Sequence, residues 1–191
     1  MYLLKQKILS SGHAKNPDIL LVDSFINHQV DIPLMQAIGQ EFARYYAGKG
    51  LTRIVTVESS GIAPAAMTAL AMGLPLVILK KQSSRILSDD ILQTTVKSFT
   101  KGTQYELTMK REFMPAGERV LLIDDFLASG EAATGVHALV SQAGAHLCGI
   151  GIVIEKAFQS GHDRLQSLGC DVYSLARIRS MDENHIEFVD D

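Results

Sequence analysis

The chain has little of what marks several large classes of protein. It has two cysteines, Cys148 and Cys170, without metal-ligand spacing, so we expect buried free thiols in a reducing compartment. No apolar run approaches the roughly 20 residues that a membrane span needs. Lysines interrupt the apolar start of the chain and no small-residue cleavage pattern follows, so we expect no signal peptide. Together these absences predict a cytoplasmic protein.

Basic charge is not in excess either. The net charge is −3 at pH 7, which argues against a broad cationic surface for nucleic acid but leaves a local patch open. Apolar residues make up 47% of the chain and charged residues 20%, as in ordinary globular proteins. The 191 residues suffice for one domain with its own core, and no repeat or low-complexity segment divides them. We therefore predict a single domain over residues 1–191, with neither nucleic acid nor membrane as a partner.

Patterns of covalent catalysis are also missing, because no Ser-His-Asp or Cys-His arrangement is evident. The histidines are scattered without ligand spacing: His13, His28, His137, His146, His162 and His185. We assign them no role.

The most informative stretch is residues 120–135, VLLIDDFLASGEAATG. Residues 120–123 predict a strand buried on both faces, which Asp124 and Asp125 are expected to end. A short loop over 126–130 and a helix from Glu131 should follow. Ligands of open α/β sheets bind at the carboxyl ends of such strands.

Chemistry follows from this arrangement. The small residues Ala128, Ser129, Gly130 and Ala132 let the backbone approach a ligand, and the helix N-terminus after them offers free N–H groups to a phosphate. The two acids can bind sugar hydroxyls or a metal. The stretch therefore predicts a site for a phosphorylated sugar, and the alternative is an ordinary strand-loop-helix unit with an incidental acid pair.

Strands and helices alternate along much of the chain. Residues 53–58, 62–72 and 75–79 predict a strand, a helix and a strand, and a second such unit spans about 120–154. This alternation predicts an α/β fold with a mostly parallel sheet and right-handed crossovers.

Other segments flank these units. We expect a short helix over residues 1–12 with Leu3, Leu4, Ile8 and Leu9 on one face. A helix should open at Asp31 and run to Gly48, and residues 172–178 and 185–189 should be edge strands. Polar residues 80–103 interrupt the pattern and are either disordered or a functional lid.

Residues 120–135 resemble the phosphoribosyl diphosphate (PRPP) motif of the type I phosphoribosyltransferases, which is an apolar strand, two acids and a small Ser-Gly loop in this order. The resemblance extends over the whole chain. It implies a central, mostly parallel sheet flanked by helices, a small hood formed by about residues 1–30 and the C-terminal segment, and a flexible lid loop at about 81–103. It also implies a homodimer.

The resemblance implies roles for the central motif. Asp124 and Asp125 would bind the ribose hydroxyls, directly or through Mg²⁺-bound water. The 5′-phosphate would lie on the backbone N–H groups of Ala128, Ser129, Gly130, Glu131 and Ala132. Mg²⁺ would be bound mainly by the diphosphate, because it gives up water reluctantly, so no residue is expected as a firm metal ligand.

The first strand-to-helix turn, Glu58, Ser59, Ser60 and Gly61, matches the family's pyrophosphate loop, which often contains a strained peptide bond. Lys81 could bind diphosphate oxygens as a point charge. Without the central motif, a plain turn is the better interpretation of residues 58–61, and a solvated Lys81 is as well supported as a binding one.

The resemblance also places a purine. Lys156 would donate to the 6-oxo group with Phe158 stacking on the ring, and the Leu20 backbone and Asn27 would lie at the base. An amide N–H rewards the 2-oxo group of xanthine, although the amide oxygen also accepts from guanine. Local sequence alone favours a solvated Lys156 and a loop-capping Asn27.

The resemblance thus implies a purine-salvage pentosyltransferase that transfers the phosphoribosyl group of PRPP to N9 of xanthine, giving xanthosine 5′-monophosphate (XMP) and pyrophosphate. Hypoxanthine or guanine is the alternative base. A non-catalytic, PRPP-sensing purine regulator is less expected, because residues 1–50 show no basic DNA-binding extension.

Overall fold

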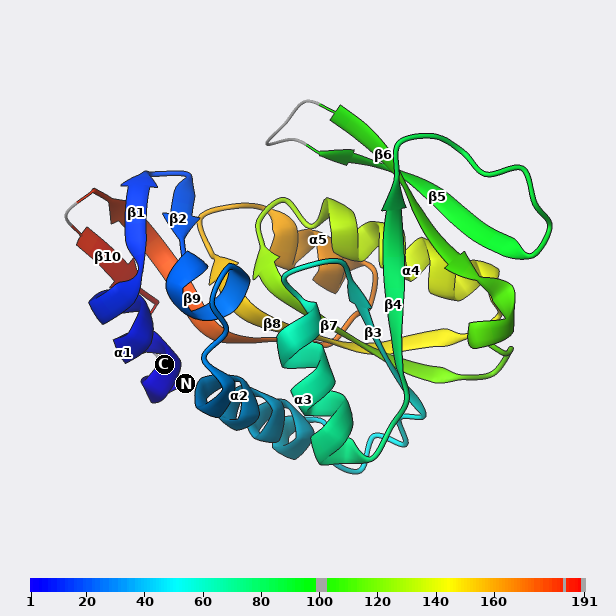
Figure 1. Cartoon of the computed structure of the whole chain (residues 1–191), viewed down its shortest axis with the longest axis horizontal. Coiled ribbons are helices and arrows are strands. Elements are labelled where there is room, and N and C mark those ends of the chain that lie inside the picture. Colours follow the sequence, from blue (N-terminus) through cyan, green and yellow to red (C-terminus); the bar gives the residue numbers. More distant parts are fainter. Residues whose placement is uncertain (99–102, 184, 190–191) are drawn as a thin grey trace.

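The computed structural model describes residues 1–98, 103–183 and 185–189. A single mixed sheet runs through the centre of the described part of the chain (Figure 1). Its strands in spatial order are β10 (His185–Phe188), β9 (Val172–Asp182), β8 (His146–Lys156), β7 (Arg119–Leu127), β3 (Arg53–Val57), β4 (Leu76–Gln82), β6 (Thr103–Lys110) and β5 (Ile91–Ser98). The five strands from β9 to β4 are parallel, and antiparallel strands flank them at both edges.

Helices cover both faces of the sheet (Figure 1). On one face lie α2 (Ile32–Tyr45) and α3 (Ile62–Met72), and on the other lie α4 (Glu131–Gln142) and α5 (Gly161–Ser167). Leu121 and Ile123 belong to the core on the α2–α3 face, whereas Val120 and Leu122 belong to the core on the α4–α5 face. Side chains of a strand alternate between faces, so a continuous apolar run is what a strand buried on both faces requires.

The predicted helix starts and ends are confirmed where capping residues set them. Asp31 accepts a hydrogen bond from the Leu34 N–H at 3.1 Å and starts α2, with Pro33 in the first turn. Gly73, with φ of 65°, ends α3.

The N-terminal elements lie beside β9 and β10 at one end of the sheet (Figure 1). They are α1 (Tyr2–Ser11), β1 (His13–Asn16), β2 (Ile19–Leu21) and a π-helical turn (Asp23–Asn27). Leu4 and Ile8 are fully buried in the α2–α3 core, but Leu3 and Leu9 are exposed, so the predicted four-residue apolar face of α1 was wrong. Cys170 is buried and Cys148 half-buried, and both are free thiols. Among the described helices, none is both long and apolar enough to span a bilayer.

Two strand predictions need correction. β7 continues through the acid pair to Leu127, because Phe126 and Leu127 pair with Ile154 and Glu155 of β8. The loop is therefore only residues 128–130. β9 is not an edge strand, since it pairs with both β8 and β10, and β10 alone forms this edge.

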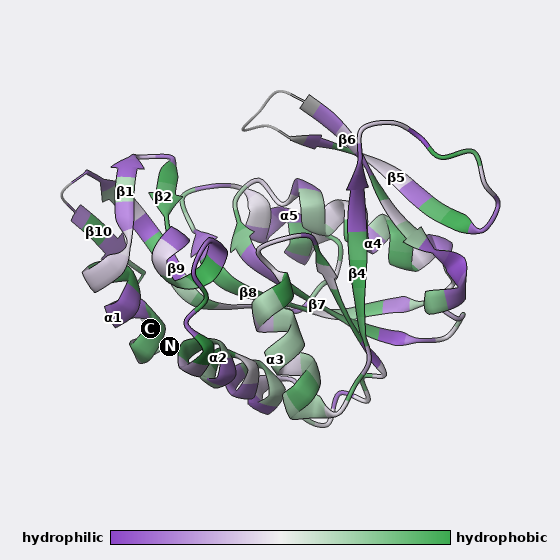
Figure 2. Ribbon diagram, in the orientation of Figure 1, coloured by the Kyte–Doolittle hydropathy of each residue, from purple (hydrophilic) through white to green (hydrophobic). Residues whose placement is uncertain are grey.

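The polar segment predicted as a lid contains regular structure. β4 continues to Gln82, and Figure 2 shows it changing from hydrophobic to hydrophilic toward this end. Residues 91–98 form β5, which pairs with β6 from Ile91 to Ser98 and packs Val96 against Gly135 of α4. Residues 99–102 of the predicted lid lie outside the described residues. Closure of residues 81–103 over the site stays a prediction.

Candidate active site

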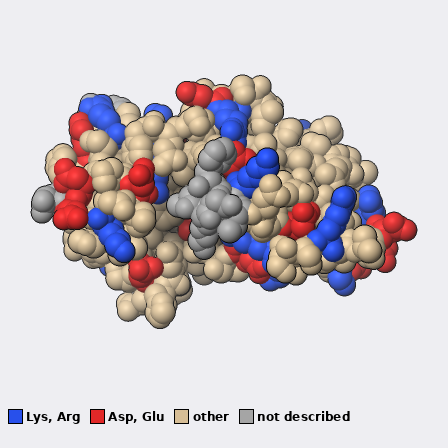
Figure 3. Space-filling view, turned by 90° about the horizontal axis from the view of Figure 1, so that it is seen from above, with Lys and Arg blue, Asp and Glu red and all other residues tan. Residues whose placement is uncertain are grey.

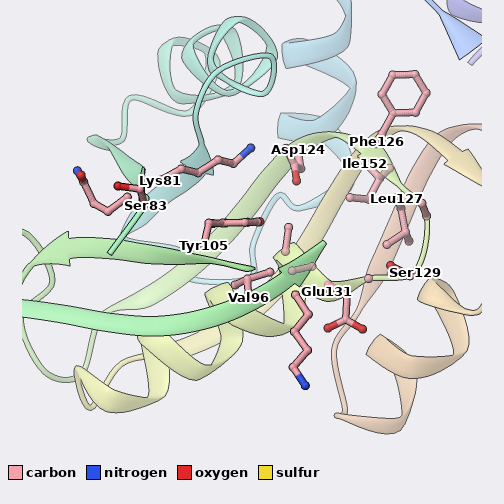
Figure 4. Close-up of a pocket in the computed structure, with 16 residues that line it drawn as sticks. Lys81, Ser83, Val96, Tyr105, Asp124, Phe126, Leu127, Ser129, Glu131 and Ile152 are labelled. Atoms are coloured by element: carbon pink, nitrogen blue, oxygen red, sulfur yellow. The ribbon is translucent and has the colours of Figure 1, made fainter. Parts of the chain in front are cut away.

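Two adjoining cavities open at the carboxyl ends of the parallel strands. One, of about 460 Å³, lies between the start of α4 and the β5–β6 ribbon (Figure 4). The second, of about 490 Å³, reaches the turn between β3 and α3. Lys81, Asp124, Phe126 and Ala132 line both, so the two cavities form one site.

The loop from β7 to α4 forms one wall of this site. All five residues from Ala128 to Ala132 line the first of these cavities. Gly130 has φ of 80°, a left-handed conformation that favours glycine, and α4 begins directly after it. The first N–H groups of a helix have no partner within the helix. The wall can therefore bind an anion through backbone donors and the positive end of the helix dipole.

The acid pair lies beside this wall. Asp124 is only 8% exposed and accepts a hydrogen bond from the Asp125 N–H at 3.0 Å. Burial, followed by the negative charge of Asp125, raises the pKa of Asp124 well above its ordinary value. Asp124 faces both cavities and Asp125 the second one. A nearby cation or hydroxyl donor would stabilise the ionised form of a carboxylate in this environment.

A basic and an aromatic residue oppose the acids. Lys81, near the end of β4, extends toward Asp124 (Figure 4). Its Nζ lies 5.6 Å from the centroid of the Tyr105 ring, which comes from β6. Burial raises the pKa of Tyr105, so its hydroxyl is a neutral donor or acceptor at the cavity. The sequence analysis missed Tyr105, because only the pairing of β6 with β4 brings it to the site.

The turn from β3 to α3 forms the far wall, where Glu58, Ser59 and Ser60 line the second cavity. The Glu58 carboxylate accepts hydrogen bonds from the Lys81 N–H at 2.7 Å and Lys80 Nζ at 3.0 Å. These donors, the Lys81 N–H first, lower the pKa of Glu58. The peptide between Glu58 and Ser59 is cis. Glu58 thus ties the turn to β4 and leaves the serines to face a ligand.

Gly61, the fourth residue of the predicted loop, is buried behind this wall and is not among the residues that line the two cavities. A Cβ at Gly61 would overlap Thr56 Oγ1 and lie 2.8 Å from Asp124 Oδ1. Thr56 is fully buried, and its hydroxyl has no hydrogen-bond partner among the described residues. Close packing of a polar cluster under the acid pair therefore depends on glycine at position 61.

The predicted purine residues lie outside the linings of the two cavities. Lys156 ends β8, and its Nζ donates to the Asp18 carbonyl in the β1–β2 turn and lies 5.6 Å from the Phe126 ring centroid. Burial lowers the pKa of Lys156. Phe126 lines both cavities, whereas Phe158 is 42% exposed. Lys156 therefore contacts both the β1–β2 turn and Phe126, a residue that lines the site. Phe126 was not predicted as a site residue, although it follows the acid pair directly.

The remaining two purine residues lie on those N-terminal elements. Leu20 is buried on β2, and Asn27 is exposed at the end of the π-helical turn, where its amide donates to Asp23 at 3.5 Å. The structure places Leu20 two residues from the carbonyl that Lys156 contacts. It does not bring Asn27 to either cavity.

Residues 29–191 match the family model described as phosphoribosyl transferase domain. The chain belongs to this phosphoribosyltransferase family. The mostly parallel sheet between helices, predicted from the alternating pattern and the PRPP motif, is thereby confirmed. The roles of individual residues stay predictions.

Relatives and solved structures agree with this membership. The chain is 54% identical to xanthine phosphoribosyltransferase 1 of Clostridium botulinum over 189 residues, which covers 99% of this chain and 100% of that protein. It is 53% identical to the xanthine phosphoribosyltransferase of Clostridium acetobutylicum, with the same coverage of both. The adenine phosphoribosyltransferase of Trypanosoma brucei superposes with a TM-score of 0.76 at 19% identity, over 91% of this chain and 79% of that one. This structural likeness shows the fold alone.

Proposed function

We propose that this protein is a cytoplasmic purine-salvage enzyme that transfers the 5-phosphoribosyl group of PRPP to N9 of xanthine, giving XMP and pyrophosphate. One observation carries the proposal. Two carboxylates line the same pair of adjoining cavities as a helix N-terminus suited to phosphate and a basic side chain, at one end of the parallel strands. The names of relatives that are more than 50% identical over almost the whole chain support xanthine as the base.

PRPP fits the site in one direction. Its 5′-phosphate lies on the N–H groups of residues 128–132, and Asp124 and Asp125 accept hydrogen bonds from the ribose hydroxyls. The diphosphate then extends toward the turn at 58–61, where Ser59, Ser60 and Lys81 line the cavity. This orientation puts the anomeric carbon between the acid pair and Phe126.

The reaction needs positioning more than a nucleophile. The bond from the anomeric carbon to diphosphate breaks with its electron pair staying on the diphosphate, a bond to N9 forms, and the N9 proton passes to the released diphosphate or to water. Positive charge develops on the sugar ring, and the Asp124 and Asp125 carboxylates stabilise it while Lys81 binds the leaving diphosphate. Exclusion of water by the β5–β6 ribbon would prevent hydrolysis of the activated sugar.

Mg²⁺ bound with PRPP fits the donor set. The described residues contain no cluster of three or more His, Cys, Asp or Glu side chains that could hold a metal ion by themselves. Two neighbouring carboxylates at a cavity suit an ion that keeps its waters and binds mainly substrate phosphates. When bound, Mg²⁺ would neutralise charge on the diphosphate, and Asp124 and Asp125 would hold it through water or through the ribose hydroxyls.

The base is proposed to lie at Lys156, which donates to the 6-oxo group after exchanging its contact with the Asp18 carbonyl. We keep the purine contacts expected from the resemblance, which are stacking by Phe158 and contacts of Asn27 and the Leu20 backbone with the base. Phe126 is the second candidate for stacking, because its ring lines both cavities and lies near Lys156. Phe126→Leu and Phe158→Leu separate the two, since loss of base stacking should raise KM for the base by about tenfold in only one variant.

The test is pyrophosphate release from PRPP and Mg²⁺ with xanthine, guanine, hypoxanthine or adenine. We expect the highest kcat/KM with xanthine, and Asn27→Ala should reduce its advantage over hypoxanthine. Faster use of adenine than of any 6-oxopurine would overturn the proposed role of Lys156. The homodimer implied by the resemblance is a further proposal, tested by the sedimentation equilibrium mass.

A further inference from the structure

Helix α5 contacts the β7–α4 loop directly. The Gly161 N–H donates to the Ala128 carbonyl at 3.0 Å, and Arg164 Nη1 forms an ion pair with Glu131 Oε1. A Cβ at Gly161 would overlap the Ala128 oxygen and lie 3.0 Å from the Gly130 nitrogen. The start of α5 is therefore packed against the loop with no space between them.

Helix α5 is in turn anchored to the strand that carries Lys156. Glu155 is 1% exposed, and its carboxylate bonds His162 Nδ1 at 3.1 Å and Arg177 Nε at 3.0 Å. A buried carboxylate bound on both oxygens defines the position of its partners. Glu155, near the end of β8, thus fixes the position of α5, and α5 carries the Arg164 side chain that contacts Glu131.

The partner of Arg164 has a charge of the wrong sign for a phosphate site. Glu131 is the first residue of α4 and lines the cavity between α4 and the β5–β6 ribbon. Its carboxylate is favourable for the helix dipole, but it competes with a bound phosphate for the same positive helix end. An unpaired Glu131 would also repel a phosphate dianion electrostatically.

We propose that Arg164 is a positioning residue for the phosphate loop. It neutralises the Glu131 carboxylate and holds that side chain toward α5, so that the backbone donors of residues 128–132 remain available to the 5′-phosphate. This inference rests on the proposed function, because it assigns the anion at the loop as the 5′-phosphate of PRPP.

Two explanations of the ion pair predict different signs. If it only stabilises the local structure, loss of either partner should weaken phosphate binding alike, and modestly, as for most partly exposed pairs. If it controls charge, Arg164→Gln leaves Glu131 unpaired and weakens binding. Glu131→Gln then removes the repulsion, leaves Arg164 free and strengthens binding.

The experiment compares Arg164→Gln, Glu131→Gln and the double variant. We measure KM for PRPP and kcat with xanthine, and Kd for ribose 5-phosphate by calorimetry. Arg164→Gln should raise KM and Kd about tenfold while kcat changes far less, Glu131→Gln should lower both about threefold, and the double variant should return close to the unaltered protein. Arg164→Lys should recover most of the loss. Arg44→Gln, which breaks a comparable exposed pair with Glu41 on α2, is the matched control and should leave both constants unchanged.

Weaker binding in both single variants would overturn the inference, as would a fall in kcat with KM unchanged. Circular dichroism and thermal unfolding identify a variant that weakens binding because it is poorly folded, and Arg164→Lys then decides by its KM. If the unaltered protein binds ribose 5-phosphate but releases no pyrophosphate with any base, the proposed function fails and the calorimetric comparison still tests Arg164. If it does not bind ribose 5-phosphate, both fail.

Discussion

The two strand-to-helix turns of the site look alike in sequence but are supported differently. Each follows a buried parallel strand, ends in glycine and opens a helix. At the β7–α4 turn, Gly130 is needed for its left-handed conformation, and α5 supports the loop from behind. At the β3–α3 turn, Gly61 has an ordinary φ of −69° and is needed because Asp124 leaves no room for a Cβ. One glycine thus serves backbone geometry and the other serves packing.

The charges around the two turns differ as well. The β3–α3 turn has Lys80 and Lys81 beside it, and the Glu58 carboxylate is directed to β4. The β7–α4 turn has one carboxylate, Glu131, countered by Arg164. On the face shown in Figure 3, Lys and Arg residues are mixed with Asp and Glu residues rather than gathered in a single field. Local pairs of opposite charge therefore decide which groups at the site remain free for an anion.

The largest effect should come from the acid that adjoins both turns. Asp124→Asn should lower kcat by about 10²-fold or more, because a preorganised charge at the developing cation is lost. The same variant should be more stable than the unaltered protein at neutral pH. Burial raises the folded-state pKa of Asp124 above 3.8, so the unaltered protein loses stability as pH rises through that pKa, and asparagine does not.

Denaturant unfolding at several pH values tests the second part. The stability gap between Asp124→Asn and the unaltered protein should widen from below pH 3.8 upward. Asp125→Asn is the comparison for activity. If the difference in unfolding free energy does not depend on pH, the pKa of Asp124 is not raised by burial in the folded protein.

Gly61→Ala should have the next effect, and it tests the packing explanation of the β3–α3 turn. The added Cβ would displace Asp124 or Thr56, so kcat should fall by about tenfold to a hundredfold. Overpacking should also cost about 1–3 kcal/mol of unfolding free energy. Gly73→Ala adds backbone strain at a left-handed φ of 65° but meets no neighbouring atom, so it controls for a destabilised glycine variant away from Asp124. Equal losses of kcat in both variants would contradict the role of space under Asp124.

Gly161→Ala should act on the other turn, and through KM rather than kcat. The Cβ would push on the Ala128 carbonyl and shift the donors for the 5′-phosphate, so KM for PRPP should rise by about tenfold. Steady-state kinetics with varied PRPP measures this. A loss confined to kcat would place α5 in a role other than support of the phosphate loop.

The smallest effect is expected for Glu58→Gln. Glutamine can still accept from the Lys81 N–H, so the main loss is the charge pair with the half-exposed Lys80, which contributes less than about 1 kcal/mol. The folded-state pKa of Glu58 is lowered from 4.5, so its contribution is present above pH 4.5 and disappears as pH falls through the lowered pKa. Unfolding free energies of both proteins should therefore converge in acid. A large change in KM for PRPP would instead indicate that Glu58 itself meets the diphosphate.

Local patterns were enough for the framework of the molecule. The apolar run at 120–123, the cap at Asp31 and the stop at Gly73 each depend on neighbours along the chain, and the structure has them as predicted. The loop at residues 128–130 and the acid pair could be placed in the fold for the same reason. They follow one strand and precede one helix, so their position at the carboxyl end of β7 follows from sequence order.

Residues that come to the site from distant segments of the chain could not be predicted from the sequence. Tyr105 comes to the cavity only because β6 pairs with β4, and Arg164 comes to Glu131 only because α5 packs behind the loop. The β5 strand was not predicted for a related reason. Only Leu92 and Val96 of its inner face belong to the apolar core, and they are buried against elements far along the chain, while Thr95 and Lys97 are exposed.

The amino-acid order by itself thus determined the strand-helix alternation and the family motif, on which the prediction of a phosphorylated-sugar site rests, because these depend on neighbouring residues. Only the tertiary structure decided which charges remain free at the site, since Glu58 and Glu131 find their partners on β4 and α5. Burial also depends on packing between distant segments, so a local sequence pattern does not predict it. In this protein burial raises the pKa of Asp124 and lowers the pKa of Lys156.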